Sequence, residues 1–437
     1  RAMTTTGVEA APDLGAATRV RFHPLRIRPS DDDPDSVVVG RPEVGEFVEL
    51  PAIGVRAVEL LDGGAPIGVA EERIAADHDV ELDLVDLVLA LREAGLVAEV
   101  DGRPAGGARR EDRPHLPWLR ARHVRWLFGP AAKVAYVALV AATLATVVRR
   151  PELLPSYRDF FWTGYVGLAV LVNTVLFSGT AVLHEFSHLV AARSLDAPAR
   201  IRFATRLHHL VLETDVTAIW SVPRRHRYRV YLSGLLWDSA VVCAALLVMA
   251  YARPHPLVGG LLSAVVLVIV MSMALQLHVY MRTDCYFVLL DLLRCRNLFQ
   301  DGFAYARHLL RRGLHAALPG RMTPSAGDPT AVLPPHERRA VRIYALAVVA
   351  GSAVALSSFV LFGIPIVAHG AIQAGSAVLA GATGGSLLAA VDGALVLLVE
   401  GTLQAMFLVT FYRRHSRRRR ARATSGQAPH AAPDPIG

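Results

Sequence analysis

Two histidines and a glutamate stand close together near the end of a long apolar run. They are His184, Glu185 and His188, in the H-E-x-x-H of the stretch AVLHEFSHLVAARSL. On a helix, side chains four residues apart share one face, so both imidazoles can reach one Zn²⁺ at about 2.0–2.1 Å. The glutamate can then take a proton from a zinc-bound water. The alternative interpretation is a solvated pair of histidines at a helix end.

A catalytic zinc needs a third protein ligand and an open position for water. Asp284 is the candidate, because it follows an apolar run that we expect to cross the membrane in the same direction as the run that carries His184. Both segments then bring metal-binding side chains to the same side of the bilayer. We predict that His184, His188 and Asp284 bind Zn²⁺, with Glu185 as the catalytic base.

The composition indicates a membrane protein. Of 437 residues, 53% are hydrophobic and only 19% are charged. The apolar residues crowd into six runs, near 131–148, 161–193, 228–251, 257–281, 341–367 and 386–411. Each run is about long enough for a transmembrane helix, which needs roughly 20 residues. The expected fold class is mainly α: a polytopic helical membrane protein of about six transmembrane helices, with a small N-terminal α+β domain of winged-helix type.

Arginines indicate the orientation of these runs, because cytoplasmic loops carry an excess of Lys and Arg. They are dense before the first run, between the second and third, between the fourth and fifth, and after the sixth, in RRHSRRRRAR. The exception is Arg149, Arg150 and Arg158 after the first run. About 130 mostly polar residues, without a secretory signal, come first. We therefore expect a multi-pass protein of a bacterial cell membrane with both termini cytoplasmic.

The N-terminal part is expected to hold one small domain. Residues 1–30 have little pattern and are expected to be disordered, whereas 31–105 contain two strands, SVVVG and EFVEL, followed by three helices and the strand AEV. Residues 106–130, rich in Gly, Pro and Arg, are the expected linker. Residues 131–412 would form the membrane-embedded catalytic domain, and 413–437 a basic disordered tail.

Winged helices often bind DNA, but the charge of this one argues against nucleic acid as a partner. Between Asp31 and Asp101 the basic residues are four arginines, and acidic residues outnumber them. Binding to phosphates requires a cationic face. The stretch FVELPAIGVRAVELLDGGAPIGVAEERIAADHDV, with LVLALREAGLV after it, instead resembles the PqqD-like peptide-recognition domain. That resemblance implies a leader peptide that adds as a strand to the edge of a sheet. A generic winged-helix adaptor is the alternative.

The membrane part also resembles a known family, the site-2 protease family of intramembrane zinc metalloproteases. GTAVLHEFSHLVAARSLDAPARI is similar to its first motif and RTDCYFVLLDLLRCRNL to its second, most closely in the branch of putative peptide zinc metalloproteases. The resemblance implies His184, His188 and Asp284 as zinc ligands and Glu185 as base. Cys285 stands where glycine is usual, and His278 where an asparagine is expected. Each either contributes to the metal site or has a packing role.

Other polar residues are open to two interpretations. Asn173 either orients substrate or makes an interhelical hydrogen bond. Asp392 and Glu400 either line a hydrated path or form structural pairs inside the sixth run. Asp291 is expected to cap a helix or form a salt bridge rather than bind metal, and Asp215 is expected to be a turn residue.

Three functions are consistent with these observations. The first is intramembrane proteolysis, the hydrolysis of a membrane protein or a ribosomally made peptide by a zinc metalloendopeptidase whose N-terminal domain recruits the substrate. The second is a non-catalytic membrane protein that binds peptides for maturation or export. The third is a membrane transporter, which only Asp392 and Glu400 support.

Overall fold

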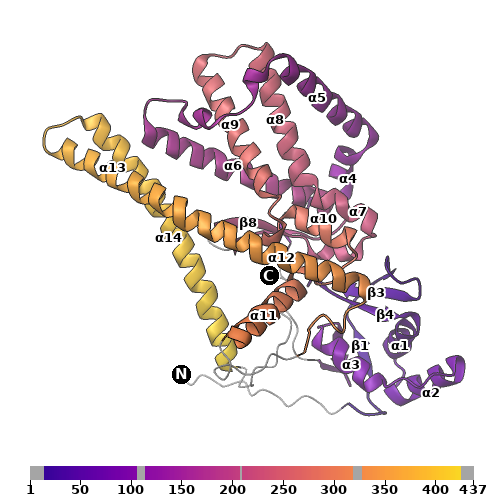
Figure 1. The fold of residues 1–437 in the computed structure, drawn as a ribbon. Coiled ribbons are helices and arrows are strands. Elements are labelled where there is room, and N and C mark those ends of the chain that lie inside the picture. Colours follow the sequence, from indigo (N-terminus) through magenta and orange to yellow (C-terminus); the bar gives the residue numbers. More distant parts are fainter. Residues whose placement is uncertain (1–13, 106–113, 207–208, 318–326, 425–437) are drawn as a thin grey trace, which may run out of the picture. The chain divides into compact units, whose positions relative to one another are not determined.

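A computed structural model describes residues 14–105, 114–206, 209–317 and 327–424. The chain divides into two compact units (Figure 1). The first consists of Arg1–Val124, Ala192–Arg200 and Asp215–Arg227, and the second of Arg125–Ala191, Ile201–Thr214 and Tyr228–Gly437.

The first unit contains two small antiparallel sheets and three helices. The sheets have the strand orders β2-β3-β4 and β1-β5-β6. The strands are β1 (Val20–Phe22), β2 (Arg26–Pro29), β3 (Ser36–Arg41), β4 (Glu46–Pro51), β5 (Val97–Val100) and β6 (Arg103–Pro104). The helices are α1 (Ala52–Asp62), α2 (Ile67–His78) and α3 (Leu84–Glu93). The two strands, three helices and last strand expected from the sequence are all present.

Helix α3 shows how local sequence builds this domain. Its first turn is capped by the side chain of Asp83, which accepts a hydrogen bond from the backbone N–H of Asp86 at 3.0 Å. Leu84, Val88 and Leu91 then recur on one face and are buried in the core. The apolar stripe therefore decides how α3 packs, and the cap decides where it begins.

The expectation of disorder over residues 1–30 is wrong for residues 14–30, which are ordered and contain β1 and β2. Val20 is fully buried, and β1 pairs with β5 through Val20 and Val100. β2 pairs with β3 along four residues. β1 and β2 have only three and four residues, in which arginine alternates with apolar residues. Such short strands give no sequence signal, because pairing with strands distant in sequence stabilises them. Residues 1–13 lie outside the described part.

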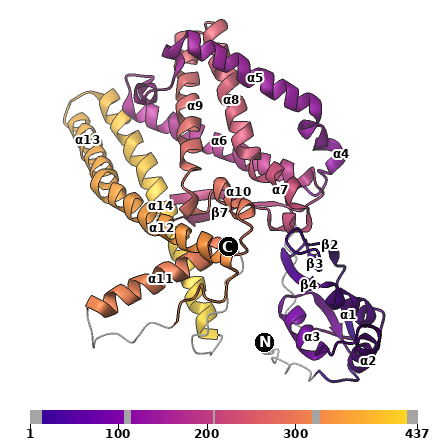
Figure 2. The same ribbon diagram turned by 45° about the vertical axis from the view of Figure 1, so that its right-hand side comes forward.

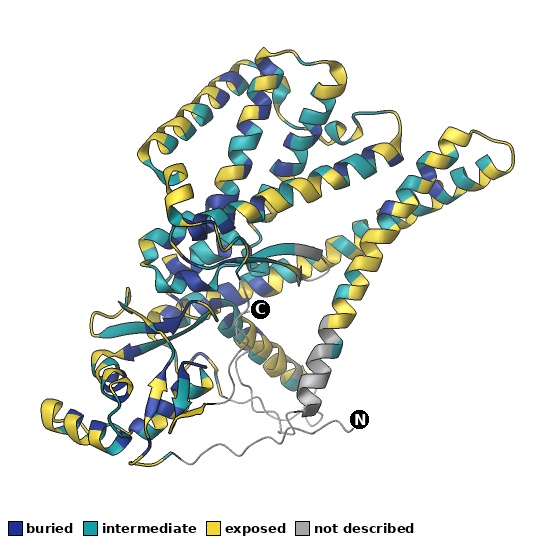
Figure 3. Cartoon of the chain, turned by 180° about the vertical axis from the view of Figure 1, so that it is seen from behind, coloured by how far each residue is buried: buried dark blue, intermediate teal, exposed yellow. Residues whose placement is uncertain are grey.

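The second unit contains six helices that are long and apolar enough to cross a membrane, among the described residues. They are α5 (Pro130–Arg149), α6 (Val166–Arg193), α8 (Ser233–Tyr251), α9 (Pro256–Leu275), the continuous helix Pro335–Ala382, and α14 (Leu387–Thr424). Large apolar side chains on their outer faces are exposed, as lipid contact requires (Figure 3). The protein is therefore a mainly α, multi-pass membrane protein, as expected.

The fifth apolar helix is much longer than the expected run 341–367. α12 (Pro335–Ser358) passes through a π-helical turn, η6 (Phe359–Gly363), directly into α13 (Ile364–Ala382). Pro365, at the start of α13, lacks the N–H of an α-helical bond, which favours a wider turn before it. The 48 residues would extend roughly 72 Å, more than twice the ~30 Å hydrocarbon core.

Short elements connect these helices. They are α4 (Ala121–Val124), η1 (Arg125–Phe128), η2 (Pro151–Leu153), η3 (Tyr157–Phe161), β7 (Arg200–Arg206), β8 (His209–Asp215), η4 (Thr217–Ser221), α7 (Arg224–Tyr231), η5 (Val279–Met281), α10 (Asp284–Leu292) and α11 (Leu298–Ala317). The expected linker 106–130 thus contains α4 and η1, and residues 106–113 lie outside the described part. The expected disordered tail 413–437 is helical as far as Thr424, because arginine is a good helix former; residues 425–437 are not described.

Candidate metal centre

Helix α6 brings His184 and His188 together one turn apart. Both side chains are buried, with 5% of each residue exposed, and their ring centroids lie 5.0 Å apart. α6 has 28 residues, several more than a transmembrane crossing needs. Figures 1 and 2 show α10 close to the ends of α8 and α9, so the aspartate at the start of α10 can come near the histidines.

Three donor atoms of these side chains converge. The Nε2 atoms of His184 and His188 are 3.2 Å apart, and each lies 3.0 Å from Oδ2 of Asp284. These residues form one cluster that could hold a metal ion. Donor atoms at ~2.0–2.1 Å from a tetrahedral zinc would be roughly 3.3 Å apart, so a small shift of the side chains suffices.

The other nitrogen of each imidazole is held by a hydrogen bond. Nδ1 of His188 donates to the backbone oxygen of Val230 at 2.8 Å, with the Ser233 hydroxyl 3.1 Å away. Nδ1 of His184 lies 2.8 Å from Oδ2 of Asp238, which is itself 3% exposed. With the proton of a neutral ring on Nδ1, the lone pair of Nε2 points into the cluster. This is the arrangement by which proteins orient histidines that bind a metal.

Gly234 in α8 leaves the space that the cluster needs. A Cβ atom at this position would lie 2.3 Å from Cε1 of His184, 2.4 Å from its Nε2 and 2.6 Å from Nε2 of His188. Any side chain here would push both rings away. The backbone of α8 can therefore lie directly against the two donor atoms only because residue 234 is glycine.

Asp284 is positioned by the turn between α9 and α10. The Gln276 carboxamide oxygen accepts a hydrogen bond from the backbone N–H of Asp284 at 3.0 Å, and the Gln276 carbonyl accepts one from the Thr283 hydroxyl at 2.6 Å. The Gln276 amide nitrogen lies 3.5 Å from Nε2 of His184, so it faces the cluster. Burial opposes ionisation of Asp284. When the imidazoles are protonated and hold no metal, the charge of His188 and the Nε2–H hydrogen bonds of both rings outweigh burial and lower the pKa of Asp284.

Glu185 is held by a strand rather than by another helix. The Thr214 hydroxyl, at the end of β8, lies 2.7 Å from Oε2 of Glu185 and 2.9 Å from its backbone oxygen. One face of α6 thus carries the two imidazoles, and the neighbouring carboxylate is oriented by β8.

The residues present fit a divalent transition metal. Two imidazole nitrogens and one carboxylate oxygen are ligands of catalytic zinc sites, and three protein ligands leave a position for water. The ligands come from α6 and α10, and α8 supplies the hydrogen bond of His184 and the glycine.

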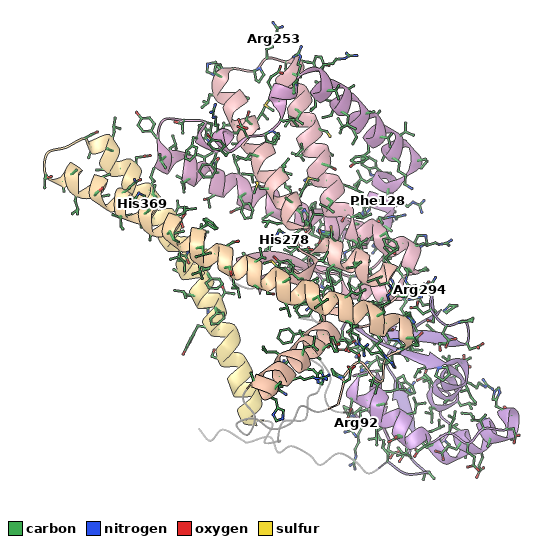
Figure 4. All side chains as sticks on the ribbon, viewed as in Figure 1. Arg92, Phe128, Arg253, His278, Arg294 and His369 are labelled. Atoms are coloured by element: carbon green, nitrogen blue, oxygen red, sulfur yellow. The ribbon has the colours of Figure 1, made fainter. Side chains whose placement is uncertain are left out.

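His278 and Cys285 are not members of the cluster of His184, His188 and Asp284. His278 lies in the turn after α9, where its Nδ1 is 3.1 Å from the Leu275 carbonyl (Figure 4). Burial, and then the charge of Asp284, raise the pKa of the Cys285 thiol, which disfavours the thiolate that a metal would need. Asp291 is buried in α10 and also lies outside the cluster.

The other polar residues have local structural partners. Asn173 accepts a hydrogen bond from the indole of Trp162 at 3.2 Å and donates one to the Phe160 carbonyl at 2.9 Å. Asp215 accepts hydrogen bonds from the backbone and hydroxyl of Thr217, as expected of a turn residue.

Asp392 of α14 caps the start of α6. It accepts a hydrogen bond from the backbone N–H of Leu168 at 3.1 Å, where the first N–H groups of a helix have no internal partner. A Cβ on Gly167 would lie 2.0 Å from the Asp392 carbonyl oxygen, so glycine permits this close approach. The contact weakens the transporter hypothesis. The transporter hypothesis also depended on Glu400, which is half-buried in α14.

Sequence reasoning missed four residues around the cluster: Gly234, Asp238, Gln276 and Thr214. Asp238 had a usable signal, because an ionisable residue inside an apolar run is costly without a partner. The other three carry no signal in their own sequence neighbourhood. Thr214 contacts Glu185, 29 residues away. Gln276 contacts His184, 92 residues away, besides its nearer contact with Asp284.

Comparison with protein-family models, curated proteins and solved structures finds no match to this chain. The fold and the site alone therefore define the class of protein. It is a multi-pass helical membrane protein with a candidate metal centre of two buried histidines and one partly buried aspartate.

Proposed function

We propose that this protein is a membrane-embedded zinc metalloprotease that hydrolyses peptide bonds of a membrane protein or a ribosomally made peptide. The observation that carries the proposal is the convergence of three donor atoms within 3.2 Å of one another, with both histidines held through Nδ1. A glutamate adjacent to the first histidine completes the set. The resemblance of the two motifs to site-2 proteases supports the same function.

In this proposal His184, His188 and Asp284 would hold the zinc, which when bound would supply Lewis acidity toward a peptide carbonyl and a water molecule. Glu185 accepts the proton of that water and passes it to the leaving amine. The Thr214 hydroxyl orients the Glu185 carboxylate. The Gln276 amide, which faces the cluster, can donate a hydrogen bond to the carbonyl oxygen of the substrate as negative charge develops on it.

The first unit is proposed to recruit the substrate. Its sheet β2-β3-β4 has two outer strands, β2 and β4, and an extended peptide could add to such a strand. The resemblance to PqqD-like domains supports a leader peptide as the partner. The arginine distribution supports a cell-membrane location with both termini cytoplasmic.

The proposal is tested by comparing wild-type protein with Glu185→Gln in cells and after purification. Glu185→Gln keeps all three proposed ligands, so bound zinc measured by mass spectrometry should stay at one equivalent. Mapping of protein N-termini in the cells should find new termini with wild type that are absent with the variant. His188→Ala is the matched control and should lose both metal and cleavage.

Identical sets of N-termini in wild-type and Glu185→Gln cells would overturn the protease function. If zinc were bound in that case, the non-catalytic peptide-binding alternative would replace it. Failure of wild-type protein to bind zinc would remove both the cofactor and the mechanism.

A further inference from the structure

Helix α11 (Leu298–Ala317) is a long amphipathic helix outside the six candidate spans. Its sequence LFQDGFAYARHLLRRGLHAA contains three arginines and one aspartate. Apolar residues recur at spacings of three and four, which places them along one side of the helix. At 1.5 Å per residue, the 20 residues extend roughly 30 Å.

One side of α11 packs against α12. Leu298 is fully buried and Ala306 is 8% exposed. A Cβ on Gly302 would lie 2.7 Å from Cδ1 of Tyr344, so the two helices cross closely at this point. This contact fixes where α11 lies along α12.

The crossing point lies where the sequence of α12 changes from charged to apolar. The first two turns of α12 are charged, with Glu337, Arg338, Arg339 and Arg342, and from Tyr344 onward the helix is apolar. A transmembrane helix changes in this way where it leaves the headgroup region and enters hydrocarbon. α11 therefore crosses α12 at the depth of the membrane–water interface.

Apolar side chains on the neighbouring face of α11 are exposed. Phe303 is 46% exposed and Leu310 64%. Arg307, Arg311 and Arg312 on the same helix are exposed as well. The Arg307 guanidinium lies 5.1 Å from the centre of the Phe303 ring, so basic and apolar groups adjoin. A helix with a basic face and an exposed apolar face suits an anionic membrane surface.

We infer that α11 lies in the plane of the bilayer and binds anionic phospholipid headgroups. Phe303 and Leu310 enter the boundary between headgroups and acyl chains. Arg307, Arg311 and Arg312 pair with phosphate groups above them. This inference does not depend on the proposed protease function.

The test uses the full-length protein in nanodiscs of phosphatidylcholine alone and of phosphatidylcholine with 30 mol% phosphatidylglycerol. Amide hydrogen exchange of residues 298–317 is measured in both. We expect exchange at least about tenfold slower in the anionic discs, because each arginine near an anionic surface adds to binding. The variant Arg307→Gln/Arg311→Gln/Arg312→Gln should exchange equally in both discs. The control variant Arg56→Gln/Arg73→Gln, in the first unit, should behave as wild type.

Equal exchange of wild type in the two discs would overturn the inference. Slow exchange in both discs that survives the triple substitution would point to a protein contact over this face and would also overturn it. If the triple variant does not fold, a second measurement on wild type replaces it. About 0.5 M salt should speed the exchange of α11 in the anionic discs, because salt screens the attraction between arginines and lipid phosphates. No effect of salt would contradict headgroup binding.

Discussion

Asp238 on α8 accepts a hydrogen bond from His184 on α6, with 2.8 Å between Oδ2 and Nδ1. Both helices are apolar enough to cross the membrane, and Asp238 is almost fully buried. A carboxylate in such surroundings is costly unless it is paired. The pair fixes the orientation of the imidazole and increases the electron density on its Nε2, the atom that faces the cluster.

Asp238→Asn is therefore expected to weaken zinc binding by 10- to 100-fold, because partners that orient a metal-binding histidine typically contribute that much. Competition with a fluorescent zinc chelator measures the change. The matched control is Ser239→Ala, which removes a polar contact of the same helix to Tyr136 without touching the histidines. An Asp238→Asn protein with wild-type affinity would show that the hydrogen bond is not used in binding.

Gly234→Ala should displace both imidazoles, because the added Cβ would lie 2.3 Å from the His184 ring. We expect loss of bound zinc and a decrease of about 1–3 kcal/mol in the free energy of unfolding from overpacking. Gly179→Ala on α6 is the matched control, since nothing lies within 4 Å of its added Cβ. Full zinc content in Gly234→Ala would contradict the position assigned to α8.

Thr214→Val should lower the rate of peptide cleavage about tenfold without changing zinc content. The substitution removes the hydroxyl that lies 2.7 Å from the Glu185 carboxylate and keeps the shape of the side chain. Single-turnover cleavage and metal analysis separate the two effects. Thr214→Ser keeps the hydroxyl and should restore most of the rate; failure to do so would indicate that only packing matters.

Metal removal should destabilise the second unit. A ligand that binds only the folded protein stabilises it by about 2.7 kcal/mol at 100 times its dissociation constant. A chelator should therefore lower the Tm of wild type but leave that of His188→Ala unchanged.

Zinc binding should also depend on pH. Protons compete with metal for the Nε2 atoms of His184 and His188, so zinc affinity should fall as pH falls. Asp284, whose pKa is lowered, should stay ionised meanwhile.

The first unit contains a buried guanidinium that offers a separate prediction. Arg227 is 1% exposed, lies 3.2 Å from Asp31 and sits 4.3 Å from the centre of the Trp220 ring. Arg227→Ala should lower the free energy of unfolding by about 1–3 kcal/mol, because Asp31 would lose a buried partner. Arg56→Ala, which breaks an exposed pair with Glu59, should cost at most about 0.5 kcal/mol. Denaturant unfolding followed by Trp fluorescence compares them.

Local sequence predicts the spans and the three clustered side chains. An apolar run of 20 residues has few alternatives to a membrane helix, and H-E-x-x-H places two histidines on one helical face whatever surrounds them. The expectation that two runs cross in the same direction places Asp284 on the side of His184. These features depend on periodicity and length, which a sequence displays directly.

The rest of the site depends on packing between helices. In the sequence, Gly234 is indistinguishable from other small residues of a membrane helix. Its role follows only from the contact with His184 and His188 of α6. β1 and β2 have too few residues to show periodicity, and pairing with β5 and β3 stabilises them. The helix continues past the expected end at residue 367 through a stretch with His369, Gln373 and three glycines, which weaken the apolar pattern.

The cap that Asp392 provides has a mechanical consequence for α6. A lone apolar helix can shift along the membrane normal at a cost of only fractions of a kcal/mol per ångström. His184 follows Leu168, whose N–H the cap holds, by a rise of roughly 24 Å along a rigid helix. The contact with α14 therefore restrains α6 against movement along the membrane normal. In this way it sets the depth of His184 and His188 in the bilayer.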